Sequence, residues 1–384
     1  MITYDYIITG LGCAGMSLLH YLLESPLKSK KILVIDSCSK NTNDRTWCYW
    51  AEKPLEIHPK STPLIFWNEI NIINEGKAVR KKLGKLKYFH IKSSDFYSQT
   101  LEKIRNSQNI TFIKDNVSEI TELNETSVQV KTKSNGNFSS GKVFNSIPSL
   151  QIQENSQYAL KQIFLGWKIK TEQPFFDTGA ATLMHFNSTK NSLTDFFYIL
   201  PYKENEALIE YTLFSKKSCS VAEMEIEIKN FIKEDLKIED YEISFEEKGC
   251  IPMTTQINTE SKSNKIIPIG TLAGCSKPST GYTFYDIQKH SRQIIQKLVK
   301  ENSSSFFTWK RNIRFTFYDN ILLNIAIKWP HALPGVFTEL FSKNSAPSIL
   351  KFLHEETNIL EEIRILSRLS FPIFIKSLIQ YEKH

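Results

Sequence analysis

The stretch TYDYIITGLGCAGMSLLHYLL, residues 3–23, decides the fold of this chain. Its first part, residues 4–9, is a short β-rich run, and residues 13–24 follow with a helix-like pattern. ILVID at 32–36 is then a second apolar run with the length and composition of a buried strand. This order of strand, helix and strand predicts a βαβ unit with parallel strands.

Three glycines between the first strand and the helix match the pattern Gly-x-Gly-x-x-Gly. Gly10 suits a tight turn, Gly12 lets the backbone approach a pyrophosphate, and Gly15 lets helix and strand pack closely. Asp36 ends the next strand at the expected distance and can accept hydrogen bonds from ribose hydroxyls. The expected ligand contacts of the turn are Gly10, Gly12, Cys13, Ala14 and Gly15. A glycine-rich turn without a ligand is the alternative, but the βαβ context and Asp36 favour a dinucleotide site.

Composition narrows the possible classes of protein. The 384 residues are 41% hydrophobic, enough for one large core or two fused cores, and the net charge is +7. Because the charge is spread along the chain without a basic and aromatic module, a nucleic-acid partner is not expected. The six cysteines contain no Cys-x-x-Cys spacing, so neither a metal site nor a disulfide framework is predicted.

Residues 6–23 contain no charged side chain except His20, and their length is close to that of a membrane span. Three glycines within them would weaken a spanning helix, whereas a buried strand, turn and helix need glycines there. We therefore expect a buried βαβ unit, and no signal or transit peptide is visible before it.

The rest of the chain alternates between strand and helix patterns. The predicted strands after the βαβ unit lie at 110–120, 127–132 and 142–148. The predicted helices lie at 221–234, about 282–300 and within a C-terminal segment, 310–384. An Asn-Gly pair predicts a turn at 133–141, residues 160–250 suggest a β-sheet layer, and 301–305 is interpreted as a linker.

A second glycine-rich segment follows at IIPIGTLAGCSKPSTGYTF, residues 266–284. Its pattern of strand, loop and helix start favours FAD over NAD, because a molecule as long as FAD commonly needs a distant return segment to hold its flavin end. The residues expected to shape this loop or face the flavin are Gly270, Gly274, Pro278, Ser279, Thr280, Gly281 and Tyr282. The alternative is an ordinary helix start capped by Ser279 or Thr280, and both interpretations can hold together.

Six motifs in order along the chain carry a resemblance to one family. They are GLGCAG at 10–15, NDRTWCYW at 43–50, FLGWKI at 164–169, ALIEYTLF at 207–214, GCIPM at 249–253 and KPSTGYTF at 277–284. In these motifs the chain resembles the bacterial FAD-containing lycopene β-cyclases, almost from end to end. The resemblance implies an α/β fold similar to the aromatic hydroxylase flavoproteins, with a Rossmann-like FAD-binding domain, an inserted β-sheet substrate domain and a helical C-terminal segment.

The expected domains are a discontinuous FAD-binding domain at 1–150 and 250–305, with 60–100 able to join the substrate layer, a substrate domain at 151–249 and a helical segment at 306–384. The chain departs from the family pattern at three places. The acidic pair of Phe-Leu-Glu-Glu-Thr is reduced to Glu210, because Tyr211 replaces the second acid. His185 stands where an aspartate is expected, and Thr271 replaces the aspartate that flavoproteins often carry in the return segment.

The family's reaction closes the ends of lycopene by protonating a carbon-carbon double bond, forming a ring on the cation and losing a proton. Glu210 is the predicted proton donor, since burial beside Ile209 and Tyr211 would favour its neutral form. The alternative is an outward-facing glutamate paired with a lysine. Reduced FAD would stabilise the cation electrostatically, and NADPH or NADH would reduce the flavin.

The expected walls of the site are flat and apolar, as a polyene requires. Arg45 is expected to contact the cofactor, and the candidate substrate-lining residues are Asp44, Trp47, Trp167, Tyr198, Tyr211 and Phe284. Further aromatic candidates are Phe196, Phe197 and Tyr285, although core packing explains such residues equally well. His185 is left out of the catalytic set, and FLHEET at 352–357 is interpreted as solvated charge.

Residues 314–337 combine cationic and apolar side chains and suggest peripheral docking on a membrane, because the substrate dissolves only in lipid. A core helix is the alternative. The expected location is the bacterial cytoplasm, on the inner face of the membrane. Two other functions stay open: a flavin monooxygenase or reductase of another lipid, and a carotenoid-binding protein without catalysis.

Overall fold

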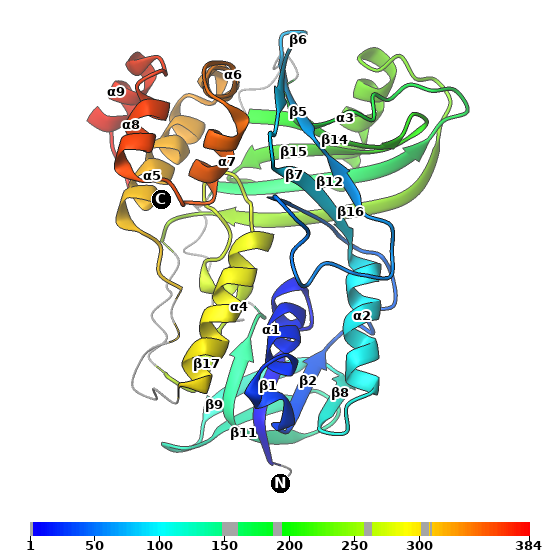
Figure 1. Ribbon diagram of the computed structural model, residues 1–384, viewed down its shortest axis with the longest axis vertical. Helices are drawn as coiled ribbons and strands as arrows, with labels where there is room; N and C mark the ends of the chain where they lie inside the picture. Colours follow the sequence, from blue (N-terminus) through cyan, green and yellow to red (C-terminus); the bar gives the residue numbers. More distant parts are fainter. Residues whose placement is uncertain (1–2, 148–159, 187–193, 257–262, 301–306, 308) are drawn as a thin grey trace.

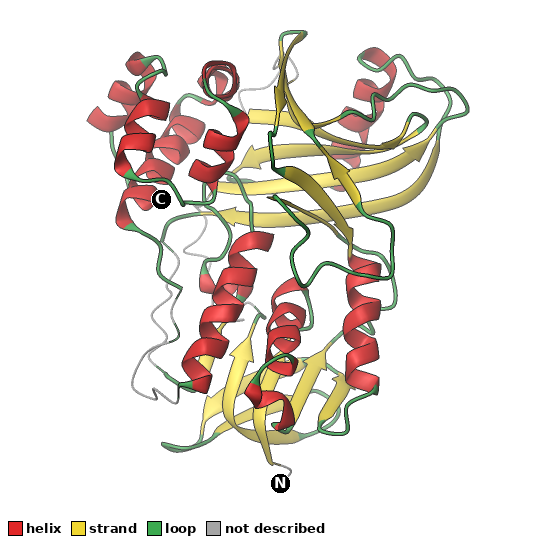
Figure 2. Cartoon of the chain, viewed as in Figure 1, coloured by secondary structure: helices red, strands yellow, loops and turns green. Residues whose placement is uncertain are grey.

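The computed structural model describes residues 3–147, 160–186, 194–256, 263–300, 307 and 309–384. Figure 1 shows two large β-sheets, one above the other, with the N-terminus beside the lower sheet. The helices of the C-terminal segment form a group beside the upper sheet, and Figure 2 shows that most strands belong to these two layers. The linker predicted at 301–305 lies outside the described residues.

The first sheet contains the predicted βαβ unit. Its strands, in spatial order, are β8 (Ile110–Lys114), β2 (Ile32–Asp36), β1 (Thr3–Thr9), β11 (Asn137–Asn145), β10 (Val128–Thr132) and β9 (Val117–Glu122), and β17 (Ile266–Pro268) pairs with β11. β8, β2, β1, β11 and β17 are parallel, whereas β10 is antiparallel to both of its neighbours, β11 and β9. The strand predicted at 110–120 is therefore wrong as one element.

That strand is divided because Asp115 turns the chain. Its carboxylate accepts hydrogen bonds from the backbone N–H groups of Asn116, Ser134 and Asn135, at 2.7, 3.0 and 2.9 Å. This turn moves the chain from one edge of the sheet to the other. The predicted turn at 133–141 is also shorter than expected, because β11 begins at Asn137.

The second sheet runs in the order β16 (Glu242–Met253), β12 (Leu160–Lys170), β15 (Glu206–Ser215), β14 (Thr194–Lys203), β13 (Ala180–Phe186), β5 (Glu69–Asn74) and β6 (Lys77–Lys82). All neighbours are antiparallel except β13 and β5. Two strands from the 60–100 region thus belong to this sheet. A small third sheet is formed by strands that precede and follow β5 and β6 in the sequence. Its spatial order is β3 (Thr46–Ala51), β7 (Lys87–Lys92) and β4 (Ile65–Trp67).

Helices cover both sheets. α1 (Cys13–Leu23), α2 (Ser93–Arg105) and α4 (Phe284–Val299) share a core with the first sheet. α3 (Val221–Glu234) packs on the far face of the second sheet. The C-terminal helices are α5 (Ile313–Lys328), α6 (Leu333–Lys343), α7 (Ala346–Leu353), α8 (Ile359–Leu366) and α9 (Phe371–Ile379), and they share a core with β5, β13 and β14.

No helix in the described ranges is both long and apolar enough to span a membrane. Residues 6–23 instead form most of β1 and all of α1, which is almost entirely buried. The interpretation of this stretch as a buried strand, turn and helix is therefore confirmed.

The glycine turn after β1 is packed at the limit of close contact. A Cβ atom added to Gly15 would lie 2.1 Å from the carbonyl oxygen of Gly10, and Gly10 itself has a φ of +89°. A Cβ atom on Gly12, by contrast, would meet nothing within 4 Å. Gly10 and Gly15 are thus required by packing, whereas the space above Gly12 is open.

We expect Gly15→Ala to lower the free energy of unfolding by about 1–3 kcal/mol, because the turn must move to admit the methyl group. Gly12→Ala is the matched control, since the same methyl group enters open space. Thermal unfolding of both proteins without added ligand measures the difference. Equal melting temperatures for the two variants would contradict the close packing of Gly15 on Gly10.

Candidate active site between the two sheets

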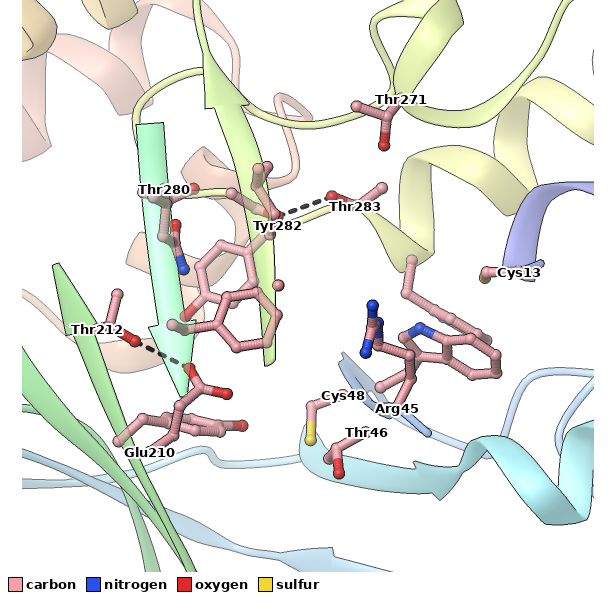
Figure 3. A pocket seen from close by; sticks show the side chains of 18 of the residues that line it. Cys13, Arg45, Thr46, Cys48, Glu210, Thr212, Thr271, Thr280, Tyr282 and Thr283 are labelled. Carbon is pink, nitrogen blue, oxygen red and sulfur yellow. Dashed lines mark hydrogen bonds between the residues drawn. The ribbon is translucent and has the colours of Figure 1, made fainter. Parts of the chain in front are cut away.

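A cavity of about 420 Å³ lies between the glycine turn and the near face of the second sheet. Figure 3 shows Glu210 and Thr212 on one side of this cavity, Cys13 and Thr271 on the other, and Arg45 between them. The lining residues on the side of the first sheet are Gly12, Cys13, Ala14, Arg45, Thr46, Trp47, Cys48, Ser146, Gly270, Thr271, Thr280, Gly281, Tyr282, Thr283, Phe284 and Ile287. Those on the side of the second sheet are Tyr88, Gln162, Phe164, Leu183, Met184, Phe196, Tyr198, Glu210, Thr212, Gly249, Cys250 and Ile251.

The glycine turn brings the start of α1 to the cavity. Gly12 is the N-cap of α1 and makes no side-chain cap hydrogen bond, so the first N–H groups of the helix point toward the space above it. Such a helix start favours negatively charged ligand groups. The predicted contacts Gly12, Cys13 and Ala14 all line the cavity, whereas Gly10 and Gly15 support the turn from within.

Asp36 holds the turn rather than lining the cavity. Its carboxylate accepts hydrogen bonds from the N–H groups of Leu11, at 2.6 Å, and Cys38, at 2.8 Å. The ammonium group of Lys40 lies 3.4 Å from the same side chain. The contact of Asp36 with a ribose stays a prediction.

The return segment divides into two parts. Gly270, Thr280, Gly281 and Tyr282 line the cavity as predicted. Gly270 lies against the start of α1, because a Cβ atom there would be 2.7 Å from the Cβ of Ala14. The tight approach of Gly270 to Ala14 joins the return segment to the glycine turn.

The other predicted residues of this segment, Gly274, Pro278 and Ser279, do not line the cavity, and their contact with a cofactor stays a prediction. Gly274 ends a 3₁₀ turn with φ +82° and so shapes the loop, as expected. The Ser279 hydroxyl donates a hydrogen bond to the buried carboxylate of Asp319. The predicted capping by Ser279 or Thr280 is wrong, because α4 begins at Phe284 with Thr283 as N-cap.

FLHEET is not a run of solvated charges, and that interpretation is wrong. Glu355 is an ion-pair partner of Lys277, at 3.1 Å, and of Arg311. Lys277 and Arg311 also pair with Asp319, so two cations and two carboxylates meet beneath the return segment. Figure 1 shows the C-terminal helices next to this part of the chain. The C-terminal segment therefore holds the loop that forms one wall of the cavity.

On the opposite wall, Glu210 projects from β15 into the cavity. Its Oε1 accepts a hydrogen bond of 2.8 Å from the hydroxyl of Thr212 (Figure 3). Burial, followed by the negative charge of Glu247, raises the pKa of Glu210 to about 8. A carboxyl group with such a pKa keeps its proton at neutral pH and can act as an acid.

Glu247, on β16, was missed by the sequence analysis. It is only 3% exposed, and its Oε2 accepts a hydrogen bond of 2.6 Å from the backbone N–H of Thr46. Burial raises the pKa of this second carboxyl group as well. Its signal in the sequence is weak, because Glu246 precedes it and only strand pairing shows which of the two faces the cavity.

Four of the predicted aromatic candidates line the cavity: Trp47, Phe196, Tyr198 and Phe284. Sequence analysis did not identify two further contacts, Tyr88 and Phe164. The hydroxyl groups of Tyr88 and Tyr198 lie 2.8 Å apart. This wall of the cavity is therefore aromatic, as expected, and its residues come from more strands than the motifs indicated.

The predicted contacts Trp167 and Tyr211 are wrong, because they lie on the far face of the second sheet beneath α3. Trp167 donates a hydrogen bond to Glu246, and the Tyr211 hydroxyl donates one to Asp195. Asp44 does not line the cavity either, and its carboxylate accepts hydrogen bonds from Ser93 and Tyr97.

Two further aromatic candidates and His185 are also away from the cavity. Phe197 stacks on Phe231 of α3, with 3.7 Å between ring centroids, and His185 contacts the same ring edge-on. Tyr285 stacks on His354 at 3.8 Å. Within the described ranges, no cluster of histidine, cysteine or acidic side chains could hold a metal ion.

Several solved structures are similar to this chain in fold, and some of them are flavoproteins or contain FAD. A geranylgeranyl bacteriochlorophyll reductase-like protein from Thermoplasma acidophilum is 12% identical, with a TM-score of 0.62 over 99% of both chains. A flavoprotein/dehydrogenase from Cytophaga hutchinsonii is 10% identical, with a TM-score of 0.61 over 98% of this chain and 99% of that one. Halogenase PltM, solved also in complex with phloroglucinol and FAD, is 12% identical, with a TM-score of 0.58 over 91% of this chain and 79% of that one.

These likenesses confirm the predicted α/β class, with a Rossmann-like flavoprotein fold and a helical C-terminal region. A comparison with curated protein sequences gave no match. The profile of one family, described as lycopene cyclase protein, matches residues 5–379, almost the whole chain. The protein thus belongs to the lycopene cyclase family.

Proposed function

We propose that this protein is an FAD-dependent lycopene β-cyclase, which closes the ψ-ends of lycopene into β-rings and gives β-carotene through γ-carotene. The reaction is an isomerisation with no net redox change. One observation carries the proposal: a single cavity contains a helix start suited to a dinucleotide and, on its opposite wall, a carboxyl group that keeps its proton.

The residues of the first wall fit FAD. The open space above Gly12 admits a pyrophosphate, and the N-terminus of α1 would favour its charge. Arg45, Gly270 and the chain from Thr280 to Tyr282 would then surround the flavin end. Reduced FAD, regenerated by NADPH or NADH, would supply negative charge that stabilises a nearby cation.

Glu210 performs the acid step in this proposal. The Thr212 hydroxyl donates to Oε1, so Oε2 is left to carry the proton toward the double bond. After ring closure, the same carboxylate can accept the proton that the ring loses, which restores the acid. Phe164, Phe196 and Tyr198 line the same wall, and their π-faces favour a positive charge while their apolar surface excludes water.

Substitution of Glu210 tests this assignment. We expect Glu210→Gln to retain FAD but to lower the rate of lycopene cyclisation by about 10²–10⁴-fold, because the acid is gone. Tyr211→Phe is the control, since the side chain of Tyr211 is adjacent in sequence but lies on the far face of the sheet. Pigment analysis of lycopene-accumulating cells expressing each protein measures the outcome.

The same pigment analysis separates the other functions. A cyclase gives a product with the mass of its substrate, whereas a monooxygenase or a reductase changes that mass. A carotenoid-binding protein without catalysis gives no product. Full cyclisation by the Glu210→Gln protein would remove Glu210 from the mechanism.

The pH dependence has a definite sign. The protonated form of Glu210 is the active one and its pKa is raised to about 8, so the activity is full below that pH and falls as the pH rises through it. An ordinary glutamate would lose its proton near pH 4 to 5. Initial rates of the FAD-loaded enzyme from pH 6 to pH 10, with the flavin kept reduced, check this; a constant rate across the range would contradict it.

We also propose that the protein docks on the cytoplasmic face of a bacterial membrane, where its apolar substrate dissolves. The segment expected to do so, 314–337, is mostly buried in the C-terminal core, including Phe315, Ile321 and Ile325. A group of exposed apolar side chains lies instead on α8 and α9: Ile359, Leu360, Ile363, Phe371, Ile375, Leu378 and Ile379, each 44–79% exposed. Arg364, Arg368 and Lys376 are exposed among them and would favour anionic lipid.

Replacing Ile375 and Ile379 together by serine should weaken binding to anionic phospholipid vesicles at least about tenfold, since two apolar side chains no longer enter the lipid. Leu123→Ser is the control, because Leu123 is an apolar residue away from this surface that is 49% exposed, close to the 51% of Ile375. Co-sedimentation with vesicles measures the bound fraction. Equal binding by the double variant and the control would exclude this surface.

A further inference from the structure

Four residues on neighbouring strands form a row across the near face of the second sheet. Tyr198 of β14 is paired with Glu210 of β15, and Glu210 is paired with Gly166 of β12. On its other side, Gly166 is paired with Glu247 of β16. Paired residues of neighbouring strands project to the same face, so both glutamates stand over the same glycine.

Gly166 leaves the space that these two side chains need. A Cβ atom at this position would lie 3.2 Å from the Cγ of Glu247 and 3.4 Å from the Cβ of Glu210. Any larger side chain would separate the two glutamates. The glycine therefore acts as a gap across which one carboxyl group affects the other.

The two carboxyl groups differ in their surroundings. Glu210 lines the cavity, with Arg45, Cys48, Tyr88 and Tyr198 on the opposing and adjacent elements. Glu247 lies behind the lining, with the Thr46 N–H on Oε2, and in the described part of the chain its Oε1 has no hydrogen-bond partner. The backbone N–H donor of Thr46 favours the ionised form of Glu247, whereas Glu210 receives only the hydroxyl of Thr212. The positive charge of Arg45 lowers the pKa of both carboxyl groups and does not distinguish them.

Two carboxylates so close in a buried site cannot both ionise without strong repulsion. When Glu247 carries the charge, a second charge on Glu210 becomes unfavourable, which is one cause of the raised pKa of Glu210. If Glu247 only accepted the hydrogen bond from Thr46, it would need an acceptor oxygen but no charge, and a glutamine would serve equally well.

We propose that Glu247 is a positioning residue that keeps Glu210 protonated by carrying the negative charge of the pair across Gly166. This inference rests on the proposed function, because it describes how the acid of that reaction keeps its proton at neutral pH. It adds a second acidic residue to the site, from a different strand and outside the cavity lining.

Glu247→Gln is the test, because the amide oxygen can still accept the Thr46 N–H while the charge is removed. We expect the pH at which cyclisation falls to half its maximum to move down by about one unit or more. Glu246→Gln is the matched control, since Glu246 is the preceding residue and contacts Trp167 on the far face. Its half-maximal pH should equal that of the wild-type protein.

A second measurement does not need activity. The carbonyl stretch of protonated carboxylic acids, followed by infrared spectroscopy against pH, assigns Glu210 as the band lost in the FAD-loaded Glu210→Gln protein. In the Glu247→Gln protein, the same band is identified by comparison with the Glu210→Gln/Glu247→Gln double variant. Its midpoint should lie at a lower pH than in the wild-type protein, by the same shift as the half-maximal pH of cyclisation.

An unchanged infrared midpoint in Glu247→Gln would overturn the inference, whether or not the protein cyclises lycopene. If the infrared midpoint shifts in Glu247→Gln but the wild-type protein leaves lycopene unchanged, the carboxyl pair is supported and the proposed function is contradicted instead. Glu247→Asp, which keeps a carboxyl group, should restore most of the wild-type midpoint if charge is the cause.

Discussion

The hydrogen bond from the backbone of Thr46 to the carboxylate of Glu247 joins two parts of the chain that are 201 residues apart. Thr46 begins β3, and its neighbours Arg45 and Trp47 reach the cavity. Because Glu247 is buried, its charge requires a partner of this kind, and displacing the strand would leave the carboxylate without a donor. This contact thus holds β3, and with it Arg45 and Trp47, against the strands that carry the acid.

Local sequence was sufficient for the features that depend on local geometry. The Gly-x-Gly-x-x-Gly turn, β1 and α1 could be predicted because the positive φ of Gly10 and the close approach of Gly15 to Gly10 arise within a few residues. Glu210 could be identified only through its motif, since an alternating strand gives no sign of which face is buried. The βαβ unit therefore followed from physics, and the acid from resemblance.

The errors on the second sheet share one physical origin, which is strand parity and register. Once Glu210 faces the cavity, Tyr211 must face α3, so the second acid of the family pattern could never have stood beside the first in this sheet. Trp167 is excluded in the same way by Gly166. Glu247 depends on the register of β16 against β12, a pairing between residues about 80 apart, which no local pattern encodes. Side chains in contact across a sheet can supply what consecutive residues cannot.

The ion pairs of Glu355 with Lys277 and Arg311 also determine how the loop that walls the cavity responds to dissolved salt. The side chains of Lys277 and Glu355 are only 5% and 14% exposed, and Lys277 also pairs with Asp319, which is 2% exposed. Mobile ions screen such buried pairs much less than they screen ion pairs on the surface. The loop therefore keeps its attachment to the C-terminal helices at ionic strengths that would weaken an exposed salt bridge.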